Sequence, residues 1–160
     1  MSTKNAIILS PNPRGVFYEG TITGAISPGT VMQVDVSEGV DGNGHFTWEP
    51  YAPGTDGDRR LVAVLLPNEL LGKVATDAYA TGDHGFVYCP VPGELMNMLV
   101  ANVAGTSDTF AVGDLMMVNT GDGKLIATTG SPESEPFFVK EAVTTALTAD
   151  TLVECVFTGY

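Results

Sequence analysis

Short apolar runs separated by glycine and proline turns cover most of the chain. The runs are rich in Val, Ile, Leu and Thr, residues that favour extended backbone on a half-buried sheet. They predict strands over residues 16–23, 30–36, 60–66, 86–91, 114–118, 124–128, 137–143 and 151–158. Turn pairs such as Pro28-Gly29, Pro92-Gly93 and Asp122-Gly123 separate them. Many short strands with Gly and Pro turns predict an all-β fold, a compact β-barrel or sandwich.

Helices are expected to be short. Asn68 is placed to cap a turn over residues 69–73. Residues 94–101 fit either a helix or a buried strand, because a continuous apolar run does not distinguish the two.

Two parts of the chain resemble each other. Residues 27–35 align with residues 111–119, each with a glycine before an apolar run, and residues 86–89 align with residues 152–155. The pattern predicts a pseudo-duplication, in which the second half repeats the plan of the first. The loop-rich stretch 39–57 is expected to account for the greater length of the first half. Chance similarity between β-turn-β segments is the alternative.

The predicted organisation is a single β-rich domain over residues 16–160, preceded by residues 1–15 as an N-terminal arm or first strand. A long loop at 39–58 carries glycines and acids together with Phe46, Trp48 and Tyr51. Aromatic anchors on a loop are typical of partner contacts. The alternative is that Phe46 and Trp48 close one end of a barrel.

Charge narrows the choice of partner. The 160 residues include 7 Lys or Arg and 19 Asp or Glu, for a net charge of −12. Nucleic acid and anionic membrane surfaces are therefore not expected as partners, since both need clustered basic residues. The apolar runs are too short for a signal peptide core or a membrane span.

Catalytic chemistry is not expected, so the sequence predicts a protein that is not an enzyme. His45 and His84 both lie in glycine-containing turns. A dyad of His84 and Cys89 can be drawn, but a structural or solvent-exposed histidine is the favoured interpretation. Cys89 and Cys155 are interpreted as buried free thiols, with a disulfide between them left open.

No metal or other cofactor is predicted. Residues 41–44 are similar to the start of a calcium loop, but His45 stands at a ligand position and the closing Glu is missing. The two histidines and two cysteines are far apart in the sequence and lack zinc spacing.

The order of motifs resembles the capsid decoration, or cement, proteins of tailed bacteriophages. The similarity rests on three patterns: Gly-Asp strand starts at 82–83 and 113–114, the Pro-Gly-Glu turn at 92–94, and the Gly-Asp-Gly-Lys-Leu hairpin at 121–125. It covers residues 60–160 best. The resemblance implies a β-barrel virion protein, commonly a homotrimer. Such a protein is made in the host cytoplasm, assembled on the outer capsid surface and has no catalytic residues.

A mechanism follows from this resemblance. Each subunit would contact the major capsid protein of neighbouring capsomers, and binding only to the assembled shell would stabilise that shell. An extended arm could add a strand to a neighbour's sheet, whereas the alternative makes residues 7–9 the first strand of the fold. The expected contact residues are Ile7, Ile8, Leu9, Pro11, Pro13, Arg14, Phe46, Trp48 and Tyr51.

A carbohydrate-binding or host-attachment module is the alternative function. It would use aromatic rings such as Trp48, Tyr51 and Tyr79 to stack on sugars.

Overall fold

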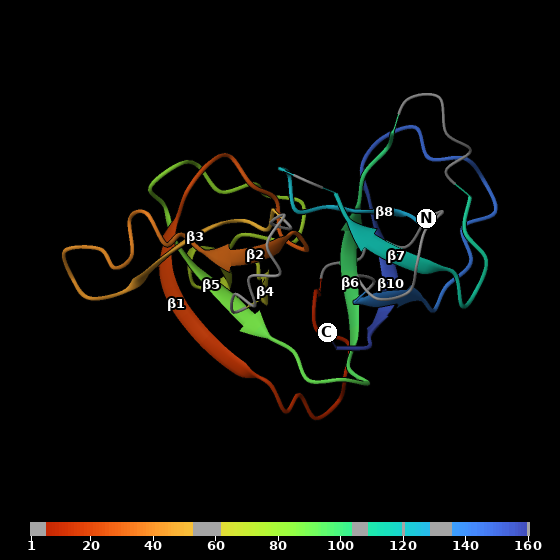
Figure 1. The fold of residues 1–160 in the computed structure, drawn as a ribbon, viewed down its shortest axis with the longest axis horizontal. Coiled ribbons are helices and arrows are strands. Elements are labelled where there is room, and N and C mark those ends of the chain that lie inside the picture. Colours follow the sequence, from red (N-terminus) through yellow and green to blue (C-terminus); the bar gives the residue numbers. More distant parts are fainter. Residues whose placement is uncertain (1–5, 53–61, 104–108, 120, 129–135, 160) are drawn as a thin grey trace.

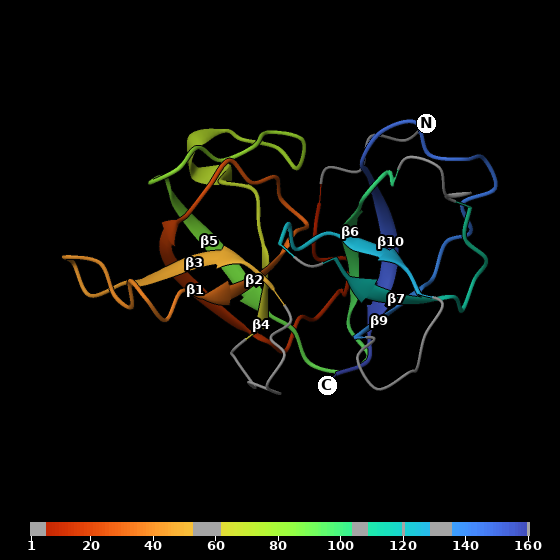
Figure 2. The ribbon, with the colours of Figure 1, turned by 45° about the horizontal axis from the view of Figure 1, so that its top comes forward.

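Within the ranges that the computed structural model describes (residues 6–52, 62–103, 109–119, 121–128 and 136–159), the chain forms ten β-strands and one 3₁₀ turn. The strands make two closed five-stranded barrels that lie side by side (Figures 1 and 2). The predicted all-β fold with only short helical segments is confirmed. Among these residues no helix has the length and apolar character needed to cross a membrane.

The first barrel contains five strands in the order β1-β3-β2-β4-β5, closed by pairing of β1 with β5. β1 is parallel to β3, and the other neighbours are antiparallel. Their bounds are β1 (Val16–Ile22), β2 (Val31–Val34), β3 (Phe46–Pro50), β4 (Val62–Leu65) and β5 (His84–Cys89).

The second barrel repeats this arrangement. Its order is β10-β6-β8-β7-β9, with β6 parallel to β8 and antiparallel to β10. Each strand therefore has the neighbours of its counterpart in the first barrel, β6 matching β1 and β10 matching β5. The bounds are β6 (Leu95–Val100), β7 (Leu115–Val118), β8 (Leu125–Ala127), β9 (Phe137–Val139) and β10 (Thr151–Phe157).

The pseudo-duplication predicted from the sequence is confirmed by this shared topology. The aligned segments lead into β2 and β7 and lie within β5 and β10. The prediction that residues 39–57 account for the extra length of the first half was only partly right. The β2–β3 loop is longer than the β7–β8 loop, but residues 66–83 between β4 and β5 also exceed residues 140–150 between β9 and β10.

Two strands were not predicted as such. β3 lies inside the stretch interpreted as a loop, where Thr47 and Trp48 are buried in the first barrel. β6 resolves the ambiguous segment 94–101 as a strand buried over most of its length. The 3₁₀ turn η1 (Glu69–Leu71) confirms the predicted short turn, but Asn68 does not cap it: its side-chain amide donates to the His84 carbonyl at 3.1 Å.

The barrels share a core. One hydrophobic cluster includes Val31 and Val64 of the first barrel together with Met98 and Val153 of the second. Backbone bonds reinforce this junction: Leu99 N–H donates to the Gly29 carbonyl at 2.9 Å, and Val31 N–H donates to the Gly123 carbonyl at 2.8 Å. Burial of this apolar surface and pairing of these backbone groups couple the two barrels.

The segment before β1 packs on the second barrel. Ile7 is 2% exposed, and Ile8 forms an antiparallel bridge with Met96 of β6. The backbone of Asn97 donates to the Ile7 carbonyl at 2.7 Å, and Leu9 N–H donates to the Leu95 carbonyl at 2.9 Å. In this structure residues 7–9 therefore form an extra edge beside β6 of their own chain.

Candidate functional site

An apolar groove of about 450 Å³ lies where the N-terminal segment meets the first barrel. Ile7 and Ile8 form one side, and Phe17 of β1 and Leu70 of η1 form the other. Leu70 is 83% exposed, Leu71 73% and Phe17 54%. Large apolar side chains gathered at this exposure are typical of contact surfaces, so the groove is a candidate for one.

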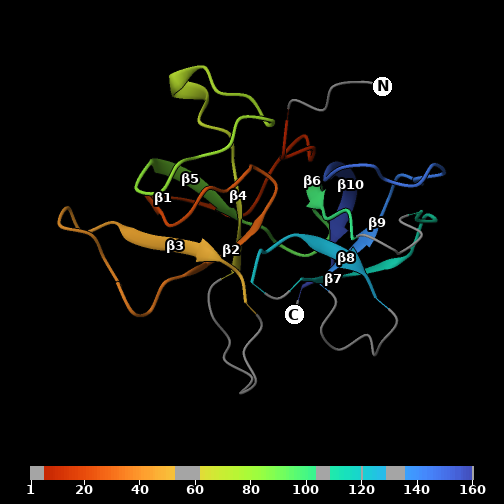
Figure 3. The same ribbon diagram turned by 90° about the horizontal axis from the view of Figure 1, so that it is seen from above.

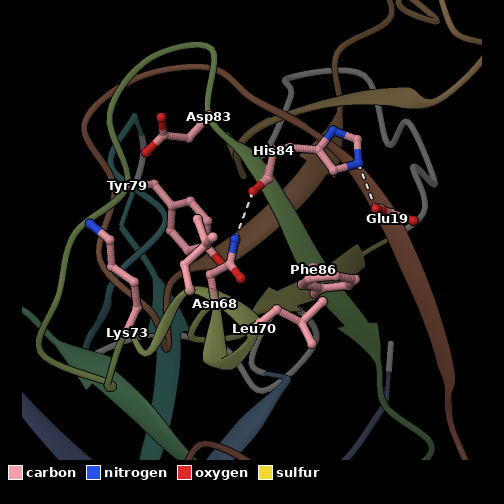
Figure 4. Close-up of a pocket in the computed structure, with 9 residues that line it drawn as sticks. Glu19, Asn68, Leu70, Lys73, Tyr79, Asp83, His84 and Phe86 are labelled. Carbon is pink, nitrogen blue, oxygen red and sulfur yellow. Dashed lines mark hydrogen bonds and ion pairs between the residues drawn. The ribbon is translucent and has the colours of Figure 1, made fainter.

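A second hollow of about 250 Å³ is also lined by Leu70. Figure 4 shows Leu70 against Phe86 of β5, with His84 and Glu19 beyond them. Leu70 and Phe86 line both hollows. We call the surface formed by Phe17, Leu70, Leu71 and Phe86 the η1 surface.

The predicted contact residues are divided between different places. Ile7 and Ile8 line the groove beside the η1 surface, while Pro11, Pro13 and Arg14 are exposed in the segment that leads into β1. Leu9 is partly buried against β6. Phe46 is 38% exposed, Tyr51 is partly buried, and Trp48 is fully buried. The role of these residues in partner binding stays a prediction, but Trp48 offers no side-chain surface to a partner in this conformation.

Sequence reasoning missed Leu70, Leu71 and Phe17. The sequence did contain an indication of this surface, because two adjacent leucines lie in a predicted turn between Pro67 and Gly72. Their exposure depends on the shortness of η1, which buries none of its residues.

Of the three aromatic residues considered for sugar stacking, Trp48 and Tyr79 are buried and Tyr51 is partly buried. Trp48 is 0% exposed and Tyr79 is 5% exposed, with its hydroxyl donating to the Leu66 carbonyl at 2.8 Å. A sugar ring needs an open aromatic face, so neither residue supports the carbohydrate-binding alternative.

Cys89 and His84 do not form a dyad. They occupy opposite ends of β5, and burial raises the pKa of the Cys89 thiol to about 11. A thiol with that pKa stays protonated near neutral pH and is a poor nucleophile. Cys89 and Cys155 are both thiols and are not joined to each other; Cys155 is buried as predicted, whereas Cys89 is only partly buried.

His84 instead belongs to a polar cluster on the first barrel. Its Nε2 lies 2.8 Å from Oε1 of Glu19 on β1, as the dashed line in Figure 4 shows. The ring of His45 stands edge-on to that of His84, with 4.9 Å between the ring centres. These three side chains come from three separate chain segments, and no local sequence pattern predicts that they meet.

Glu94 forms a buried polar cluster between the barrels. Its carboxylate accepts hydrogen bonds from the backbone N–H of Arg14, from the Tyr88 hydroxyl at 2.6 Å and from Val91 N–H at 3.0 Å. Burial alone raises the pKa of Glu94, but these donors together hold it below the ordinary value. Burial, with the hydrogen bond to Glu94, raises the pKa of Tyr88 to about 12, so its hydroxyl remains a donor.

No protein-family model matches the chain, and no curated protein matches it. Among solved structures, the head fiber gp8.5 N base of bacteriophage phi29 matches with a TM-score of 0.53 at 14% sequence identity. The match covers 91% of this chain and 95% of the phi29 chain. The fold is therefore shared over nearly the whole of both chains. The predicted family of decoration proteins stays a prediction, because the matching structure is described as a head fiber.

Proposed function

We propose that this chain is a bacteriophage virion protein that binds the outer surface of the capsid and is not an enzyme. The observation that supports the proposal most directly is the fold shared with the phi29 head fiber base along nearly the whole chain. The net charge of −12 agrees with an outer location, since packaged DNA would repel an acidic protein.

Adhesion of this kind needs an exposed apolar surface that does not hold the fold together. The η1 surface meets that requirement because Leu70 and Leu71 contribute little to the core. We assign it to contact with the major capsid protein, together with the exposed residues Pro11, Pro13 and Arg14. Apolar area removed from water there would supply binding free energy at about 25 cal/mol per Å² before the cost of association.

Shell stabilisation follows if one assembly contacts two capsomers. A homotrimer would hold three copies of the η1 surface, so that weak contacts act together. Binding that exists only on the assembled shell shifts the equilibrium away from disassembly. Light scattering of the purified protein checks the trimer, and a strict monomer would remove this part of the proposal.

The test mixes the purified protein with phage capsids assembled without this protein and measures binding. Co-sedimentation is expected for the wild type, and electron microscopy of the decorated particles is expected to show added density on the outer surface. The double variant Leu70→Ser, Leu71→Ser is expected to reduce binding at least about tenfold. Replacing each exposed leucine removes roughly 1 kcal/mol or more of contact free energy.

The matched control is Val112→Ser, which changes a 60% exposed apolar residue in the second barrel. It is expected to bind as the wild type does, and all three proteins are expected to unfold at similar temperatures. Failure of the wild-type protein to bind capsids contradicts the function, whereas full binding by the double variant contradicts only the assigned surface.

A further inference from the structure

The pairing of three strands brings the two histidines of the chain together. β1 lies between β3 and β5 in the first barrel. Thr21 of β1 is opposite His84 of β5, which makes Glu19 a diagonal neighbour of His84 on the same face. On the other side β1 pairs with β3, and His45 directly precedes that strand. Distance along the sequence, which argued against a metal site, is irrelevant to this arrangement.

The donor atoms are already close enough to share one ion. One donor atom from each of Glu19, His45 and His84 lies within 4.8 Å of the others. A tetrahedral metal with bonds of about 2.0–2.2 Å holds its donors about 3.3–3.6 Å apart. Small rotations of these side chains, which are 40–50% exposed, would produce that spacing.

Asp41 lies beside His45 and is placed to orient its imidazole ring without binding the metal itself. Its Oδ2 lies 3.7 Å from His45 Nδ1, a buried atom without a hydrogen-bond partner among the described residues. Asp41 is itself held by the Thr21 hydroxyl at 3.0 Å and by the backbone N–H groups of Asn43 and His45. A carboxylate that faces Nδ1 orients the ring and leaves Nε2 free to bind a metal.

We propose that Glu19, His45 and His84 form a binding site for a divalent transition metal of the zinc class, with Asp41 as the residue that positions His45. Two imidazoles and one carboxylate favour such an ion over Ca²⁺ or Mg²⁺, which prefer oxygen donors only. With three protein ligands, the fourth position is available to water.

The bound ion would link the end of the β2–β3 loop, at His45, to Glu19 of β1 and His84 of β5. Residues 35–45 project away from the second barrel (Figures 1 and 3), and His45 is the last residue of this loop. A ligand that binds only the folded state stabilises it, and above the dissociation constant the gain grows with the logarithm of the free ligand concentration. The site is independent of the capsid-binding proposal.

The experiment is calorimetric titration of the untagged protein with ZnCl₂, with thermal unfolding measured in parallel. One zinc per chain is expected, together with a rise in unfolding temperature. His45→Ala and His84→Ala are each expected to weaken binding at least about tenfold, and Asp41→Asn by about 10–100-fold, the range found for outer-shell partners. CaCl₂ and MgCl₂ are expected to give no comparable binding.

Glu19→Gln removes a proposed ligand. Its charge-matched control is Glu38→Gln, which changes an exposed acid in the β2–β3 loop outside the site. Only Glu19→Gln is expected to weaken binding, and circular dichroism spectra of both are expected to match the wild type. Zinc affinity that is unchanged in both histidine variants, or wild-type protein that binds no zinc, would overturn the proposal.

Discussion

The carboxylate of Glu94 connects three parts of the chain at the level of single atoms. It accepts hydrogen bonds from the segment before β1, from Tyr88 of β5 and from the turn before β6, while only 2% of the residue is exposed. Glu94→Gln keeps the shape but replaces one acceptor oxygen with a donor. We expect the free energy of unfolding at pH 7 to fall by about 2 kcal/mol, because buried donors lose a charged partner.

The pH dependence of this difference has a definite sign. The pKa of Glu94 is lower in the folded protein than its ordinary value of 4.5. Its ionised form therefore stabilises the fold above about pH 4.5, and that contribution is lost as the pH falls through the lowered pKa. Urea unfolding at pH 7 and at pH 3 is expected to show the gap between Glu94→Gln and wild type closing in acid. A gap of equal size at both pH values would contradict this account.

At the scale of elements, the junction between the barrels depends on a glycine. Gly123 has a φ of +66°, and a Cβ there would collide with the carbonyl of Val31 in β2. The same Val31 donates its N–H to the Gly123 carbonyl. Gly123→Ala is expected to lower the free energy of unfolding by about 2–3 kcal/mol through strain at positive φ and through displacement of β2.

Gly121 in the same turn provides the control. Its φ is +95°, but no described atom lies within 4 Å of a Cβ built there. Gly121→Ala therefore carries the cost of positive φ alone, about 1 kcal/mol. Chemical denaturation of both variants measures the difference, and equal losses would mean that the contact with β2 contributes nothing.

The sequence predicted eight of the ten described strands and the repeat that relates the two barrels. These strands were predictable because glycine turns and β-branched runs determine backbone conformation over a few neighbouring residues. β3 was missed because its buried Thr47 and Trp48 lie among glycines and acids that are typical of loops. β6 was ambiguous because a strand buried on both faces shows no alternation.

The candidate sites were harder to predict, since they depend on which strands become neighbours. The cluster of Glu19, His45 and His84 exists only because β1 pairs with β3 on one side and β5 on the other. Parallel pairing of β1 with β3 is a long-range choice that no local pattern specifies. The η1 surface likewise depends on how residues 66–83 cross the end of the barrel.

At the scale of the whole molecule, the shared core predicts that both barrels unfold together. Val31 and Val64 pack in one cluster with Met98 and Val153, so neither barrel can open without exposing the other's apolar surface. Trp48, the single tryptophan, reports on the first barrel by fluorescence, and the buried thiol of Cys155 reports on the second by its reactivity. In a Cys89→Ser background, the two probes are expected to give the same urea midpoint, as a single domain over residues 16–160 requires. Two separate midpoints would instead mean two independently folding domains joined by a weak interface.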